Sequence, residues 1–272
     1  MKIVPLNNLH LNEVVSEKIS LNTVNTWQSD RSKSAKSRDT SLGKVAESVI
    51  ENEIEKFENV QYLPYDDFRQ NNFKKHAPFD GLLCSKDFDK TTLEIFLSRI
   101  NNEISSNTYG KISEQLKSDL EKASIFTVEI KSTRITSRHR KPAGTQENII
   151  ANILEDDFLE YPKYMRTDKL GTITSLEKYF EYVKKKYFAN EERFSISDLR
   201  LIERNNMRVF YIRIYVDEEA KICYIPGFTT KKNFSKSFNV KHMPQINKSE
   251  KAIYLSLSLI HAEPLEQITR FF

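Results

Sequence analysis

The sequence predicts an α/β protein with a mixed central β-sheet and helices on its faces. Runs of β-forming residues alternate with segments whose apolar residues recur at helical spacing, which is typical of this fold class. No internal repeat with a period of about twenty to fifty residues is visible. No stretch has the composition of a linker, so we expect the 272 residues to form one domain.

The composition favours a globular protein of the cytoplasm. Hydrophobic residues make up 39% of the chain, and 42 Lys and Arg residues are nearly balanced by 38 Asp and Glu residues. The two cysteines, Cys84 and Cys223, lie in apolar surroundings and are expected to be buried free thiols in a reducing compartment. The first residues do not form a signal peptide, and no apolar run is long enough to span a bilayer. We therefore expect a cytoplasmic location and no membrane contact.

The most informative stretch of the chain is residues 124–133. Its apolar residues are β-formers, which predicts a buried strand. Glu129 and Lys131 are two residues apart, so on a strand both side chains point to the same face while Ile130 points to the other. Buried strands rarely carry an acid and a base, so this pair predicts a functional site.

A second acidic residue, Asp80, precedes an apolar pair that we expect to begin a neighbouring strand. Two carboxylates and one ammonium group that converge at a strand end would suit Mg²⁺, a hard cation that prefers oxygen ligands and keeps several waters. The sequence therefore predicts a magnesium site at Asp80 and Glu129.

These residues resemble a known signature. Pro78-Phe79-Asp80 followed by Glu129-Ile130-Lys131 is similar to the PD-(D/E)xK motif of nucleases such as the type II restriction endonucleases, although Phe79 separates the proline from the acid. The resemblance implies a restriction-endonuclease-like core, in which Asp80, Glu129 and the carbonyl of Ile130 bind the metal. It also implies that Lys131 holds the attacking water and stabilises the transition state, and that the products carry 5′-phosphate and 3′-hydroxyl ends.

The signature also has a less specific interpretation. Glu129 and Lys131 could form an ordinary ion pair on a half-exposed sheet face. A second Glu-x-Lys triplet, Glu219 to Lys221, lies in a polar run between two β-like stretches and predicts a turn.

An amphipathic helix is predicted at residues 42–57, with Ser41 as its N-cap. Nucleases of this resemblance often carry a Gly-x-x-x-Glu helix before the Asp strand, and Gly43 and Glu47 have that spacing. Glu47 would then join the catalytic site, and Glu51, one turn further on, is the rival for this role. Either carboxylate could instead be a solvated charge on a surface helix.

The remaining elements complete the predicted fold. Residues 1–39 are expected to form an N-terminal arm or elaboration, with a mobile loop at 29–38. Residues 91–123 form a helical insertion of two helices. We place the catalytic core at about 40–160 and a C-terminal β elaboration at 205–272. Further predicted elements are helices at 145–159 and 175–188, a hairpin of strands 207–216 and 222–228, and a last strand at 253–259.

Two basic segments, residues 130–146 and 220–248, contain no acidic residue. Such segments favour surfaces that face a polyanion, although each could also be a solvated loop. The candidate DNA-binding residues are the cations just before Asp80 and those after Lys131: Lys74, Lys75, Arg134, Arg138, Arg140 and Lys141.

The predicted function is that of a magnesium-dependent type II restriction endonuclease acting on double-stranded DNA. A homodimer would match the symmetry of a palindromic site. Two alternatives remain open at this stage. One is a repair, junction-resolving or transposon-end nuclease of the same fold, and the other is a nucleic-acid-binding module without catalysis.

Overall fold

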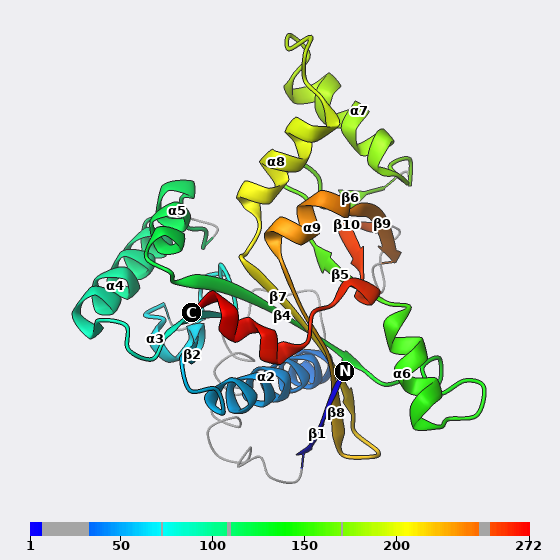
Figure 1. Ribbon diagram of the computed structural model, residues 1–272. Coiled ribbons are helices and arrows are strands. Elements are labelled where there is room, and N and C mark those ends of the chain that lie inside the picture. Colours follow the sequence, from blue (N-terminus) through cyan, green and yellow to red (C-terminus); the bar gives the residue numbers. More distant parts are fainter. Residues whose placement is uncertain (7–32, 72, 108–109, 170, 245–250) are drawn as a thin grey trace.

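A computed structural model describes residues 1–6, 33–71, 73–107, 110–169, 171–244 and 251–272, with the backbone alone for residues 33–39 and for residue 244. The protein is an α/β structure with a curled six-stranded mixed sheet flanked by helices (Figure 1). A second, smaller sheet of four strands lies next to it.

The six-stranded sheet carries the stretch that the sequence singled out. Its strand order is β1-β8-β7-β4-β3-β2. The pairing of β4 with β7 is parallel and the other pairings are antiparallel. The strands are β1 (Lys2–Pro5), β2 (Val60–Pro64), β3 (Gly81–Ser85), β4 (Phe126–Arg134), β7 (Phe210–Asp217) and β8 (Ile222–Thr230).

One face of this sheet is covered by helix α2 (Lys33–Glu55) and the C-terminal 3-10 helix η3 (Leu265–Phe271). The buried stripe of α2 is Leu42, Ala46, Val49, Ile50 and Ile54. It packs against every second residue of the central strands, Val128 and Ile130 of β4 among them. Because side chains alternate along a strand, Glu129 and Lys131 are turned to the opposite face.

On that opposite face, two separate apolar clusters leave the middle of β4 polar. Helices α4 (Lys90–Ser106) and α5 (Glu114–Lys122) cover the β3 end of the sheet, around Leu82, Cys84 and Ile125. The larger cluster covers the β7 and β8 end, around Tyr211, Tyr215 and Tyr224. Glu129 and Lys131 lie on β4 between the two clusters.

The larger cluster is built by the second sheet and four helices. Its strands β5 (Asp157–Glu160), β6 (Thr167–Asp168) and β9 (Asn239–Pro244) all pair with β10 (Lys251–Ser258). Helices α6 (Gln146–Leu154), α7 (Leu176–Tyr187), α8 (Ile196–Asn206) and α9 (Lys231–Ser237) pack around it. Figure 1 shows α7 and α8 projecting at the top, away from α2.

Glu203 of α8 is a fully buried carboxylate that fixes the segment after β5. It accepts hydrogen bonds from the Tyr179 hydroxyl at 2.5 Å and from the Lys163 amide at 2.9 Å. Burial, reinforced by the charge of Glu160, raises the pKa of Glu203 from 4.5 to about 7.

This raised pKa predicts a pH dependence of stability. The unfolded chain releases the Glu203 proton near pH 4.5 and the folded protein near pH 7, so the free energy of unfolding should fall as the pH rises through this interval. The free energy of unfolding should lose about 3 kcal/mol from the titration of Glu203, and this loss should be complete above pH 7. Urea unfolding of the protein and of Glu203→Gln between pH 4.5 and pH 8 checks this, because the variant should show a smaller decline. Parallel curves for the two proteins would contradict the assignment.

Several sequence predictions need correction. The mobile loop predicted at 29–38 is wrong for residues 33–38, which begin α2, while residues 29–32 lie outside the described residues. The helix predicted at 42–57 therefore starts at Lys33 and ends at Glu55, and Ser41 lies inside it and is not its N-cap. The helix predicted at 145–159 ends at Leu154, because residues 157–160 form β5 instead. The predicted β elaboration at 205–272 contributes two strands of the central sheet, β7 beside β4 and β8 beside β7, so the sheet that carries the site extends beyond residues 40–160.

Other predictions are confirmed. The two helices of the 91–123 insertion, the helix near 175–188, the hairpin of β7 and β8 and the last strand are all present. Residues 219–221 form a turn. Cys84 and Cys223 are buried free thiols. None of the helices in the described part of the chain is both long and apolar enough to cross a membrane.

Candidate functional site

Strands β4 and β7 present a row of polar side chains on the face away from α2. The parallel register places Glu129 beside Tyr211, Lys131 beside Arg213 and Thr133 beside Tyr215. Paired residues of neighbouring strands point to the same face, so these six side chains lie in two adjacent columns. Glu129 is 7% exposed, whereas the Lys131 side chain is 36% exposed and reaches solvent.

Asp80 joins this row from the start of β3. Its amide donates to the Val128 carbonyl at 2.9 Å, and its side-chain Oδ2 accepts from the Ile130 amide at 2.6 Å. The carboxylate therefore lies at the backbone between Glu129 and Lys131. Gly81 allows this arrangement, because a Cβ at this position would lie 2.3 Å from the ring of Tyr62.

Glu129 lies between two cations. One carboxylate oxygen bonds to the Lys131 ammonium group, and the other lies 3.2 Å from Nε of Arg208. Burial alone would raise the pKa of Glu129, but the charges of Arg208 and Lys131 outweigh it, so the pKa is lowered and the group is ionised. Burial would likewise lower the pKa of Lys131, but Glu129 and Asp80 outweigh it and raise the pKa, so the amine is protonated.

Asp80 behaves in the opposite way. Burial raises its pKa to about 8, and the nearby charges of Glu129 and Glu47 act in the same direction. Lys131 and the Ile130 amide lower the pKa of Asp80 only in part. Two carboxylates in similar surroundings thus differ in protonation, and this divergence is typical of functional sites.

Glu47 is held at the same end of the sheet by a chain of charges. It pairs with Lys44, which is itself almost buried and also contacts Asp66. Asp66 in turn accepts a 2.8 Å hydrogen bond from Arg69. Because Glu47 raises the pKa of Asp80, its charge acts on the candidate site. Glu51 lies one turn further along α2, and its charge, like that of Glu47, raises the pKa of the Tyr62 phenol.

The sequence did not reveal Arg208 and Glu160 as members of this site. Arg208 precedes β7 and donates to the Pro78 carbonyl at 3.0 Å and to Glu160 at 2.6 Å, besides its contact with Glu129. Glu160 ends β5 and also accepts from the Tyr211 hydroxyl at 2.7 Å. Arg208 thereby connects the Asp80 loop, β4 and β5. No sequence motif identifies an isolated arginine before a strand as a site residue. The only available signal was the position of Arg208 just after the polar end of a helix.

The donor set fits a hard divalent cation by its chemistry. Asp80, Glu129 and Glu47 offer carboxylate oxygens, and Asp80, whose pKa of about 8 keeps it largely protonated at neutral pH, would release its proton to a bound divalent cation. At Glu129 an incoming cation would compete with Lys131 and Arg208, which already face its oxygens. Within the described ranges, no three His, Cys, Asp or Glu residues are grouped closely enough to hold a metal by themselves.

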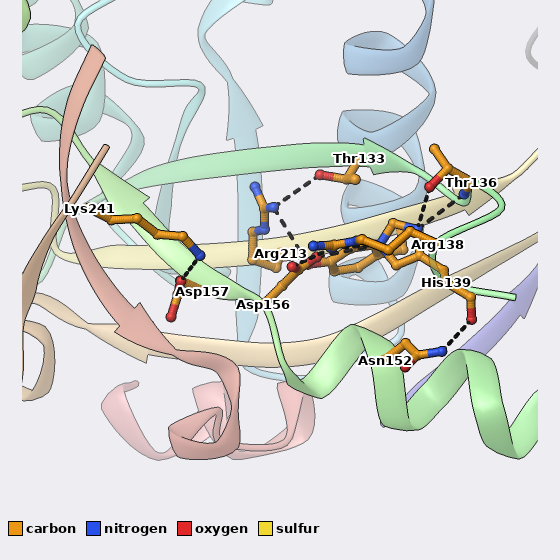
Figure 2. A network of polar contacts seen from close by, with 10 residues as sticks. Thr133, Thr136, Arg138, His139, Asn152, Asp156, Asp157, Arg213 and Lys241 are labelled. Carbon is orange, nitrogen blue, oxygen red and sulfur yellow. Dashed lines mark hydrogen bonds and ion pairs between the residues drawn. The ribbon is translucent and has the colours of Figure 1, made fainter. Parts of the chain in front are cut away.

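The basic loop after β4 is balanced by acids from elsewhere in the chain. Arg134 pairs with Glu218 at 3.1 Å, and Arg140 pairs with Asp217 at 2.8 Å. Arg138 and the buried His139 turn toward Asp156 (Figure 2). Lys141 is exposed. The lack of acidic residues within residues 130–146 therefore did not mean that the positive charges of this loop are uncompensated.

The two lysines before Asp80 occupy different environments. Lys74 is exposed, and Lys75 donates to the Asn107 carbonyl at 2.8 Å. Asn107 also contacts the backbone of Lys111. The loop before Asp80 therefore lies against the connection between α4 and α5.

The second basic segment, residues 220–248, is largely ordered secondary structure. Its residues form β8, α9 and β9, and two of its lysines pair with distant acids, Lys231 with Glu121 and Lys241 with Asp157. Residues 245–248 lie outside the described residues.

Comparison of the chain with protein-family models, with curated proteins and with solved structures finds no match. The site is therefore interpreted from its own geometry.

Proposed function

We propose that this protein is a magnesium-dependent endonuclease that hydrolyses phosphodiester bonds of double-stranded DNA, in the manner of a type II restriction endonuclease. One observation carries the proposal: the Asp80 carboxylate, just before β3, accepts from the Ile130 amide between Glu129 and Lys131 on β4, and the charges of both residues act on it. The mixed sheet, with the Glu47 helix on one face, is compatible with the restriction-endonuclease-like core that the resemblance implies.

Each group has a role that follows from its charge state. Asp80, Glu129 and the Ile130 carbonyl would hold Mg²⁺, which when bound would neutralise phosphate oxygens and acidify a water. Lys131 is protonated and partly exposed, so it would donate to the phosphate and stabilise the negative charge of the transition state. Arg208 orients Glu129 through its second oxygen. Glu47 would orient the attacking water.

The ion pair of Glu129 and Lys131 also fits the less specific interpretation of the sequence. Two observations favour the site over a simple ion pair. Glu129 is buried, and Asp80, a third ionisable group with a strongly raised pKa, accepts a hydrogen bond from the Ile130 amide between the two residues of the pair. An ordinary surface pair would need neither feature.

Supercoiled plasmid DNA provides the test. With Mg²⁺ we expect cleavage into discrete fragments with 5′-phosphate ends, and no cleavage in EDTA. With Ca²⁺ we expect DNA binding without cleavage, because Ca²⁺ accepts the same oxygens with a looser geometry. Turnover in Ca²⁺ equal to that in Mg²⁺ would contradict the mechanism. Cleavage only of branched or nicked DNA would favour a structure-specific nuclease instead.

A homodimer is part of the proposal, because cutting both strands of a palindrome requires two sites related by twofold symmetry. Sedimentation with and without DNA would measure the oligomeric state.

A further inference from the structure

Four cations gather beside the candidate site from two separate segments. Lys111 precedes α5 and Lys117 lies in it, whereas Lys163 and Arg166 lie between β5 and β6. We call these four residues the cationic rim. Among the residues that the structure describes, Lys111, Lys117 and Arg166 form no ion pair, and Lys163 pairs only with the exposed Glu114, at 3.1 Å. The rim differs in this respect from Arg134, Arg138 and Arg140, whose charges are compensated.

Direct contacts place the Lys111 side of the rim next to Asp80. Gly110 has φ +61° and lies so close to His76 that a Cβ there would be 2.3 Å from the His76 carbonyl oxygen. Two residues later, the Pro78 carbonyl accepts from Arg208, which also contacts Glu129. Lys111 therefore follows a residue that packs against the loop leading to Asp80.

The other three rim residues lie around Arg208, α5 and the segment after β5. The Lys117 ammonium donates to the Asn206 carbonyl at 3.2 Å, two residues before Arg208. Lys163 contacts Glu114 at the start of α5, and its amide is fixed by Glu203. Arg166 stacks over the Tyr161 ring at 5.4 Å.

The cations of the rim are close enough to repel one another. Burial, together with the charges of Arg166, Arg208 and Lys163, lowers the pKa of Lys111. Burial, with the charge of Arg208, lowers the pKa of Lys117 to about 8. Glu114 and Glu160 raise the pKa of Lys117 only in part, so the mutual repulsion of these cations is a cost that a bound polyanion would reduce.

We propose that the phosphate backbone of duplex DNA crosses the candidate site on the cationic rim and not on the loop of residues 134–141. This inference rests on the proposed function, since it identifies the surface on which that substrate lies. Each phosphate neutralised by the rim releases condensed counterions, so the rim should account for much of the salt dependence of binding.

The test measures the affinity of a fluorescein-labelled duplex DNA by anisotropy in Ca²⁺ buffer over a range of salt concentrations. The rim variant is Lys111→Gln with Arg166→Gln, both exposed in the structure. The matched control is Arg138→Gln with Lys141→Gln, which removes the same charge from the loop. We expect the rim variant to lose about 2 from the slope of log K against log salt and to bind at least about tenfold more weakly at physiological salt. The control should keep the slope of the unmodified protein.

Each outcome has a defined meaning. An unchanged salt slope in the rim variant, or a reduced salt slope in the control alone, would overturn the inference. The proposed function would not be affected by that result, because the plasmid cleavage assay tests it separately. Tighter binding of a duplex RNA of the same sequence would also overturn it. If the unmodified protein neither binds nor cuts DNA, both proposals fail. Circular dichroism melting of both double variants establishes that they are folded.

Discussion

Replacement of Asp80 by asparagine, or of Lys131 by alanine, is expected to lower the cleavage rate by about 1,000-fold or more. Asparagine can still accept the hydrogen bond of the Ile130 amide, so the strand pairing should survive while the ionisable oxygen is lost. Alanine at 131 removes the protonated amine that would stabilise the transition state, while Arg208 remains beside Glu129. Single-turnover cleavage of plasmid DNA in Mg²⁺ measures the effect.

The chain offers a matched control for the lysine. Lys221 ends the second Glu-x-Lys triplet, in the turn between β7 and β8, and Lys221→Ala should cleave at the rate of the unmodified protein. Thermal melting should show that Asp80→Asn and Lys131→Ala remain folded. Full activity in either site variant would refute the site, and equal losses in Lys221→Ala would show that the assay reports stability instead of chemistry.

The largest effect on stability is expected for Gly227→Ala. Gly227 has φ +138° and lies opposite Arg213, where the register between β7 and β8 shifts. A Cβ would lie 2.0 Å from the Glu263 carbonyl oxygen, which accepts from the Phe228 amide. Because this neighbour is backbone, β8 and the segment before η3 must separate. We expect the free energy of unfolding to fall by about 3 kcal/mol or more, as measured by urea denaturation.

Gly43 provides the contrasting control. It lies within α2, and a Cβ there would meet no atom within 4 Å. Gly43→Ala should therefore stabilise the protein by about 0.5–1 kcal/mol, because alanine loses less conformational freedom in a helix. Cleavage should be unaffected, since the glycine contributes no side chain. A similar loss of stability in both variants would contradict the steric argument for Gly227.

Local sequence patterns were sufficient to predict the elements around the candidate site. The alternation in residues 126–130 predicted β4 and the orientation of Glu129, and the helical stripe predicted the apolar face of α2. These features depend on periodicity along one segment, and burial of the apolar face then fixes the direction of the polar residues.

Features that depend on contacts between distant segments could not be predicted. Arg208 reaches Glu129 only because β7 lies parallel to β4, a pairing between residues about 80 positions apart. The basic appearance of the 134–141 loop was misleading for the same reason, because acids from other segments pair with its arginines: Asp156 with Arg138, and Asp217 and Glu219 with Arg140. The strand at 157–160 was missed because β10, its partner, follows almost 100 residues later.

The parallel pairing of β4 and β7 also constrains when the candidate site can assemble during synthesis. Until residues 208–217 leave the ribosome, β4 can pair only with β3, its other edge is open, and Glu129 lacks Arg208. Closing so long a loop is entropically expensive and therefore slow. A nascent chain thus carries the acids and the amine of the candidate site without the strand that holds them in place, and these groups would be arranged together only after residue 217 has been synthesised.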